Sequence, residues 1–176
     1  MNKVLAVFIA LALFASLSVA APAANSGAGK LGIGSSGTTI PGIGLRYWIS
    51  AKNAWDFNLG FRSAKDSSDM GFGASFVNVM KQTSNLKYLW LAGLQYIGCS
   101  AKTAGVSSDT TDTILGFGLG VEYNFTELPD LSFNAFLTGI GIDMVNRPAT
   151  AITPSSSETV FASDPKLGFA IRYYVK

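Results

Sequence analysis

The chain has 176 residues, 48% of them hydrophobic and 12% aromatic, and a formal net charge of +2 at pH 7. This near-neutral charge, spread without a basic patch, argues against nucleic-acid binding. The chain has no histidine and one cysteine, Cys99, which exclude a serine–histidine catalytic site and an intrachain disulfide and leave no plausible zinc ligands.

The first twenty residues have the three parts of an export signal. Lys3 precedes an apolar run at residues 4–17, and the small residues Ser18 and Ala20 flank Val19 at a cleavage position. We expect cleavage after Ala20, with cuts after Ala23 or Ala24 as alternatives. This division predicts a signal peptide at residues 1–20, a flexible leader at 21–29 and one domain at 30–176. No later segment is apolar over the ~18 residues of a membrane-spanning helix, so strands would make any crossing.

The remaining chain alternates between apolar and polar or glycine residues with a period of two, as strands do. In the clearest case Trp55, Phe57 and Leu59 share one face, and Asp56 and Asn58 share the other. Eight strands are predicted, at residues 30–35, 43–50, 55–62, 70–77, 86–96, 115–125, 131–144 and 167–175. In the seventh, the apolar parity switches near Thr138 and Gly139, which predicts a β-bulge there.

The segments between these strands differ in length. Short turns are predicted after the second, fourth and sixth strands, whereas polar loops are predicted at 63–69, 101–112 and 147–165. In an up-and-down barrel, short turns and long loops gather at opposite ends. This pattern places both chain ends and the short turns on the periplasmic side.

The residues opposite the apolar face indicate which way that face points. They are mostly glycines with a few charges of both signs, namely Arg46, Asp56, Arg62, Lys87, Glu122 and Arg172. A water-exposed outer surface would carry many more charges, whereas a narrow interior suits a few that can neutralise one another. We therefore predict an all-β fold, an eight-stranded antiparallel up-and-down transmembrane β-barrel. The alternative is a soluble or periplasmic lipocalin-like barrel that carries a small apolar ligand in a lumen lined by Trp48, Leu89 and Leu91.

With these segments in view, the chain resembles the small eight-stranded bacterial outer-membrane barrels, the group that includes the OmpA membrane domain and OmpX. The resemblance rests on the export signal and on the glycine- and aromatic-rich residues 115–125 and 167–175. It implies an outer-membrane location, contact with the assembly machinery and an interior network of opposite charges. Matched by face, that network would use Arg46, Asp56, Arg62, Glu122 and Arg172. In that group the last strand usually ends in an aromatic residue, whereas this chain ends in Val175 and Lys176.

The sequence offers no candidate catalytic residue, cofactor site or metal site. A wide diffusion pore is also not expected, because large aqueous channels need about sixteen strands. We therefore expect a non-enzymatic, monomeric barrel whose lumen is plugged by side chains. Its contacts would be outer-membrane lipid and an unknown ligand that meets the loops at 101–112 and 147–165.

Overall fold

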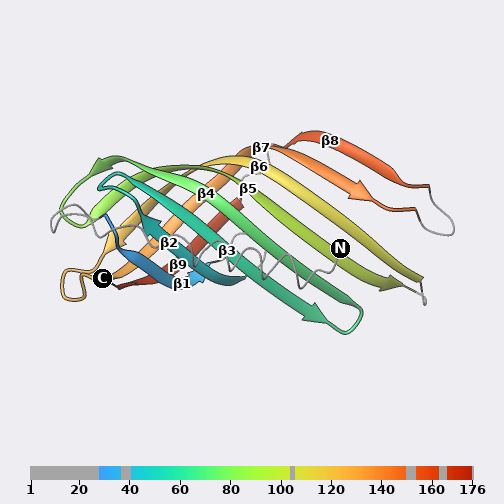
Figure 1. Ribbon diagram of the computed structural model, residues 1–176, viewed down its shortest axis with the longest axis horizontal. Coiled ribbons are helices and arrows are strands. Elements are labelled where there is room, and N and C mark those ends of the chain that lie inside the picture. The colour runs from blue at the N-terminus through green and yellow to red at the C-terminus, as the bar shows by residue number, and fades with distance from the viewer. Residues whose placement is uncertain (1–27, 37–40, 104–105, 150–153, 163–165, 176) are drawn as a thin grey trace.

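The computed structural model describes residues 28–36, 41–103, 106–149, 154–162 and 166–175. The predicted signal peptide at 1–20 and most of the leader at 21–29 lie outside these residues. The described part forms nine strands (Figure 1): β1 (Leu31–Ser36), β2 (Gly42–Trp48), β3 (Asn53–Ala64), β4 (Ser67–Gln82), β5 (Leu86–Thr103), β6 (Val106–Asn124), β7 (Leu131–Arg147), β8 (Ser156–Ala162) and β9 (Lys166–Val175). None of the described residues forms a helix long and apolar enough to cross a membrane.

Eight of these strands close into an antiparallel barrel, which confirms the predicted fold class. The hydrogen-bonded order is β6-β5-β4-β3-β2-β1-β9-β7, and pairing of β6 with β7 completes the ring. β8 pairs with β7 at Gly141–Arg147, whereas β9 pairs with β7 at Leu131–Thr138. The seam between the first and last strands is short, because β1 pairs with β9 only from Leu31–Val175 to Gly34–Arg172.

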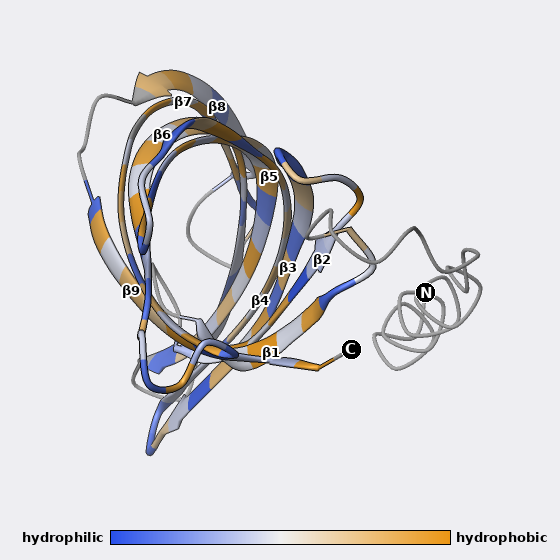
Figure 2. Cartoon of the chain, turned by 90° about the vertical axis from the view of Figure 1, so that its left-hand side faces the viewer, coloured by the Kyte–Doolittle hydropathy of each residue, from blue (hydrophilic) through white to orange (hydrophobic). Residues whose placement is uncertain are grey.

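The side chains alternate about the barrel wall as the period of two requires, with the apolar set outside. Figure 2 shows hydrophobic and hydrophilic positions alternating along the strands of the ring. Large exposed hydrophobic residues occur on the outer face of every strand of the ring; they include Ile33, Ile43, Leu59, Phe72, Leu94, Leu119, Phe133 and Ile171. The inner face carries the fully buried charged residues Arg46, Glu122 and Arg172. This arrangement is the reverse of a lipocalin-like barrel and contradicts that alternative.

Stacked and edge-on aromatic pairs run across the outer face. Trp55 of β3 packs against Phe76 of β4, Phe76 against Trp90 of β5, and Trp90 against Phe117 of β6, with ring centroids 5.5–6.0 Å apart. Such cross-strand aromatic pairs help to stabilise the sheet. The outer surface therefore has a continuous aromatic band over four neighbouring strands.

The loops predicted at 63–69 and 101–112 are largely strands, and the described part of 147–165 contains β8, which corrects the sequence interpretation. β3 and β4 are separated only by Lys65 and Asp66, β5 and β6 extend to Thr103 and from Val106, and β8 lies within 147–165. The pairs β3–β4, β5–β6 and β7–β8 project together at one end of the barrel (Figure 1). Polar residues occupy both faces of most of these segments, so the apolar period of two disappears although the backbone pairing continues.

The β-bulge expected in the seventh strand is confirmed. Phe117 pairs with Ile140 and Gly118 pairs with Thr138, so Gly139 is the extra residue. It restores Ile140 and the following apolar residues to the outer face. A second bulge, which the sequence did not predict, leaves Met80 extra between Val79 and Lys81.

Glycines permit close approach of backbones inside the wall. A β-carbon at Gly34 would lie 1.7 Å from the carbonyl oxygen of Ile171, and one at Gly42 would lie 2.0 Å from that of Leu59. No side chain can be accommodated at such distances. Glycine at these inward positions therefore lets the strands coil tightly enough to close a small barrel.

Candidate functional site

The polar residues of interest meet inside the barrel because the sheet register brings them to neighbouring positions. Arg46 on β2 stands opposite Asp56 on β3. On the other side of the barrel, Glu122 on β6 stands opposite Asn134 on β7. Closure of the ring brings these two pairs into contact across the interior. We call Arg46, Asp56, Glu122, Asn134 and Arg172 the interior network.

Arg46 is the centre of the interior network. Its Nε and Nη2 donate to Oδ2 of Asp56 at 3.2 and 2.5 Å. Its Nη1 donates to Oε2 of Glu122 at 2.5 Å and to Oδ1 of Asn134 at 2.8 Å. One guanidinium thus links its own strand, β2, to three others, and its rigid planar geometry fixes their relative positions.

Glu122 is fully buried and compensates more than one positive charge. Besides Arg46, it accepts a hydrogen bond from the hydroxyl of Tyr174 at 3.2 Å and one from Nζ of Lys87 at 3.4 Å. The Lys87 ammonium also lies 4.2 Å from the centre of the Trp48 ring. A buried carboxylate is tolerated when several donors surround it, as they do here.

Arg172 of β9 joins the interior network through Asp56. Its Nη2 donates to Oδ1 and Oδ2 of Asp56 at 3.0 and 2.9 Å. Its Nε and Nη1 are buried and have no hydrogen-bond partner among the described residues. Asp56 therefore binds two guanidinium groups, while one of these groups keeps unused donors.

Arg62, the fifth residue expected in the interior network, lies elsewhere. Its side chain is 66% exposed and its Nε donates to Oδ2 of Asp69 at 2.7 Å. Arg62 has the same parity along β3 as Asp56, but it lies at the projecting end of the strand. Face parity gave no information about the height of Arg62 in the barrel.

Asn134 and Tyr174 contribute to this site and were not identified from the sequence. Both occupy inward positions of their strands, and both are buried. A search for charged residues passes over them because they are neutral. Both lie on the face opposite to the apolar residues of 131–137 and 167–175, and this position could have identified them.

A small apolar cluster lies on the short-turn side of the interior network. Trp48, Leu89 and Tyr174 are buried in it together with Ala54, Val77 and Val79, and Leu91 packs against it. Trp48 and Leu89 therefore pack against other side chains in this cluster, and Trp48 also lines a pocket at this end of the barrel.

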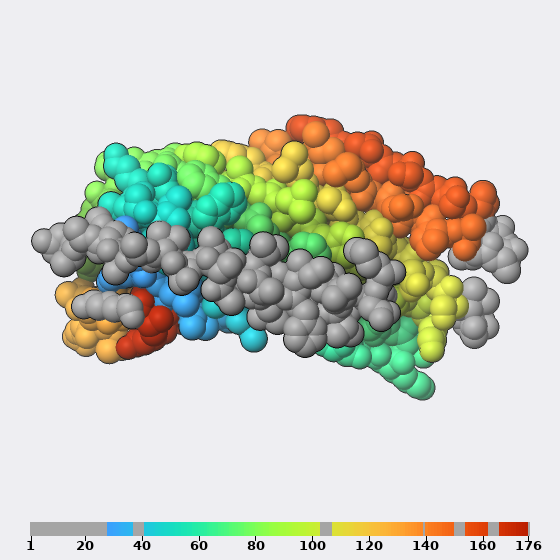
Figure 3. All heavy atoms as spheres, in the orientation of Figure 1, coloured from blue at the N-terminus to red at the C-terminus, as the bar shows by residue number. Residues whose placement is uncertain are grey.

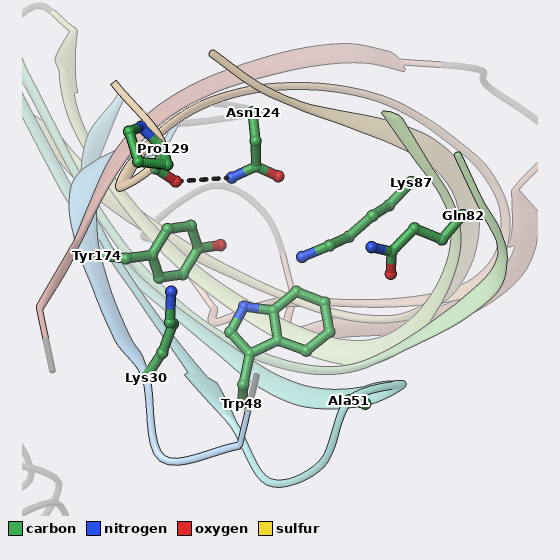
Figure 4. Close-up of a pocket in the computed structure, with 8 residues that line it drawn as sticks. All are labelled: Lys30, Trp48, Ala51, Gln82, Lys87, Asn124, Pro129 and Tyr174. Atoms are coloured by element: carbon green, nitrogen blue, oxygen red, sulfur yellow. Dashed lines mark hydrogen bonds between the residues drawn. The ribbon is translucent and has the colours of Figure 1, made fainter. Parts of the chain in front are cut away.

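A polar pocket of about 200 Å³ lies at the same end, beside the short turns. Its lining includes Lys30, Gln82, Lys87 and Asn124, with Trp48 and Tyr174. Figure 4 shows the ammonium groups of Lys30 and Lys87 reaching into the pocket from different sides. In the part of the chain that the structure describes, no group of three or more acidic or cysteine side chains is placed to hold a metal ion.

Neither a family model nor a curated protein matches this sequence. Among solved structures, the chain is similar to the N-terminal β-barrel domain of OprF from Pseudomonas aeruginosa. The identity is 13%, the TM-score is 0.59, and the match covers 84% of this chain and 98% of that domain. At this level of identity the likeness concerns the fold, and it shows that this chain has the OprF type of closed eight-stranded barrel.

Proposed function

We propose that this chain is a non-enzymatic outer-membrane β-barrel whose wall is immersed in lipid and whose lumen is closed by its own side chains. The observation that carries the proposal is the direction of the side chains: large hydrophobic residues cover the outside while arginines and carboxylates are buried inside. Soluble monomers rarely expose apolar patches larger than a few hundred Å². Contact with hydrocarbon gives this surface a suitable environment.

Ring closure supports the same proposal. Within hydrocarbon each backbone N–H and C=O needs a partner inside the protein, which a closed barrel provides. β4, β5 and β6 pair with neighbours along both edges over most of their length. Figure 3 shows the resulting elongated body, with the strand pairs projecting beyond it at one end.

The closed lumen is supported by the interior network and the apolar cluster beneath it. Arg46 links β2, β3, β6 and β7, and buried Trp48 and Leu89 pack on its short-turn side. We infer that this layer blocks free passage of solutes and holds the barrel in shape. Its carboxylates Asp56 and Glu122 are both engaged by guanidinium groups, and the chain has no histidine to act as a general base.

The projecting strand pairs are the parts that would meet an external ligand. β5–β6 and β7–β8 end in polar residues such as Ser107, Asp109, Ser157 and Glu158. A surface-interaction role at these tips agrees with their exposure and with the predicted export signal. A monomer suffices for such a role, with lipid and the assembly machinery as its other contacts.

Tryptophan quenching by brominated lipid tests the membrane orientation. Two single-tryptophan proteins are compared: one retains Trp55, which is 41% exposed, and the other retains Trp48, which is 2% exposed. In each, the other two tryptophans are replaced by phenylalanine. We expect lipid brominated on its acyl chains to quench Trp55 strongly and Trp48 weakly.

Two results would contradict the proposal. Equal quenching of both proteins would mean that the two faces are not separated by lipid. A protein that stays soluble without detergent and does not enter vesicles would favour a soluble barrel. A folded, inserted barrel should also migrate differently on a gel before and after heating.

A further inference from the structure

We propose that the barrel interior binds a small inorganic anion of the chloride class beside Arg172. The side chain of Arg172 is buried, and only its Nη2 has a partner, the carboxylate of Asp56. Nε and Nη1 are buried without an acceptor in the described structure. A guanidinium is always charged in proteins, and leaving its donors unsatisfied in a buried position is costly.

The charges around Arg172 leave room for one more negative charge. Three cationic side chains, Arg46, Arg172 and Lys87, share the two carboxylates of Asp56 and Glu122. Counting these five groups, three positive and two negative charges leave a net charge of +1. An anion at Arg172 would neutralise this excess and accept the unused N–H groups at the same time.

The packing around Arg172 restricts the size of any occupant, since its side chain is only 1% exposed. The Asp56 side chain, which binds Arg172, is 14% exposed. A water-sized particle therefore reaches the interior network at this level. Gly44 provides no further room, because a β-carbon there would lie 2.8 Å from Cβ of Ser36 and 3.7 Å from Nη2 of Arg172. This tight packing excludes an organic ligand, so the proposed occupant is a monatomic anion.

The surroundings also favour anions. Lys30 and Lys87 both line the polar pocket at the short-turn end, on the same side of the barrel as Tyr174 (Figure 4). Tyr174 lies two positions beyond Arg172 on the same inward face of β9. Clefts lined by one sign of charge raise the local concentration of the opposite ion. The inference depends on this interior geometry and not on the proposed membrane function.

Chloride-35 NMR of the folded full-length protein in detergent tests the inference. We expect protein-dependent broadening of the chloride line that bromide suppresses by competition and that gluconate, too large for the site, does not. The Arg172→Gln variant should bind chloride about tenfold or more weakly, because hydrogen bonds to a charged group are lost. The matched Arg62→Gln variant removes an exposed guanidinium and should behave like the wild type.

Three outcomes would overturn the inference. Absence of competable broadening in the wild type would mean that only water occupies the site. Broadening of wild-type size in a folded Arg172→Gln protein would place the ion elsewhere. Should Arg172→Gln fail to fold, bromide-soaked crystals of the wild type decide the matter, and no anomalous peak beside Arg172 would refute the site.

Discussion

Replacing Glu122 with glutamine is expected to destabilise the folded barrel by about 3 kcal/mol. Breaking a buried ion pair by removing one partner costs about 3–5 kcal/mol. Glu122 is fully buried and accepts from Arg46 at 2.5 Å, Tyr174 at 3.2 Å and Lys87 at 3.4 Å. The lower end of the range is appropriate because Arg46 keeps its bonds to Asp56. Glutamine preserves the size of the side chain, so the loss comes from charge and not from a cavity.

A matched control is available on the surface of the same barrel. Glu158 pairs with Arg147 at 3.5 Å, and both side chains are more than half exposed. Exposed ion pairs contribute about 0–1 kcal/mol, so Glu158→Gln should change stability by less than 1 kcal/mol. A double variant, Arg46→Gln with Glu122→Gln, should be less destabilised than the sum of the single variants, since the two residues contact each other.

The assay is urea unfolding of the protein in lipid vesicles. Tryptophan fluorescence and the mobility difference between heated and unheated samples give the folded fraction. The reasoning fails if Glu122→Gln and Glu158→Gln unfold at the same urea concentration. It also fails if the double variant shows strict additivity, because the carboxylate would then contribute nothing through Arg46.

Three further changes test other parts of the structure. Leu119→Arg places a charge on the outer face and should destabilise the vesicle-inserted barrel by about 2–4 kcal/mol. The control Leu128→Arg, in an exposed turn, should have little effect. Equal urea midpoints for the two variants would argue against lipid contact. Gly34→Ala should prevent the native barrel from forming, because its β-carbon would overlap a backbone oxygen at 1.7 Å. The control Gly98→Ala, whose β-carbon would have its nearest atom at 3.8 Å, should fold. The heat-dependent gel shift distinguishes the folded variant from the unfolded one. Deleting Gly139 removes the bulge and should turn the outer side chains that follow it inward, so recovery of a normally folded band would contradict the register.

The orientation of the wall was predictable because the face opposite the apolar one carries mostly glycines and few charges. The fold class was predictable from a local property, the two-residue period of strands. The same property located the bulge at Gly139, where the apolar parity switches. Strand length was not predictable in this way. Around Ser107 and Asp109 both faces of the strand are polar, so no amphipathic pattern marks it. The backbone pairing nevertheless extends the strand through these residues.

The candidate site was predictable only in part. Parity assigned Arg46, Asp56, Glu122 and Arg172 to one face, and the register of the sheet brings them together. Height along the barrel depends on strand tilt and stagger, which no local pattern reports. Arg62 shows this limit. It has the parity of the inner face, but it lies beyond the interior network, beside Asp69.

The short seam between β1 and β9 has a consequence for how the ring forms and opens. Among the described residues, four pairs join these strands, from Leu31–Val175 to Gly34–Arg172, whereas β5 pairs with β6 along its whole length. The seam also joins the segments that are farthest apart along the chain, which makes its loop-closure entropy the largest in the molecule. The hairpins should therefore form first, and β1 should pair with β9 last. In the finished protein, the amide hydrogens of Leu31–Gly34 should exchange with solvent earlier than those at the centre of β5.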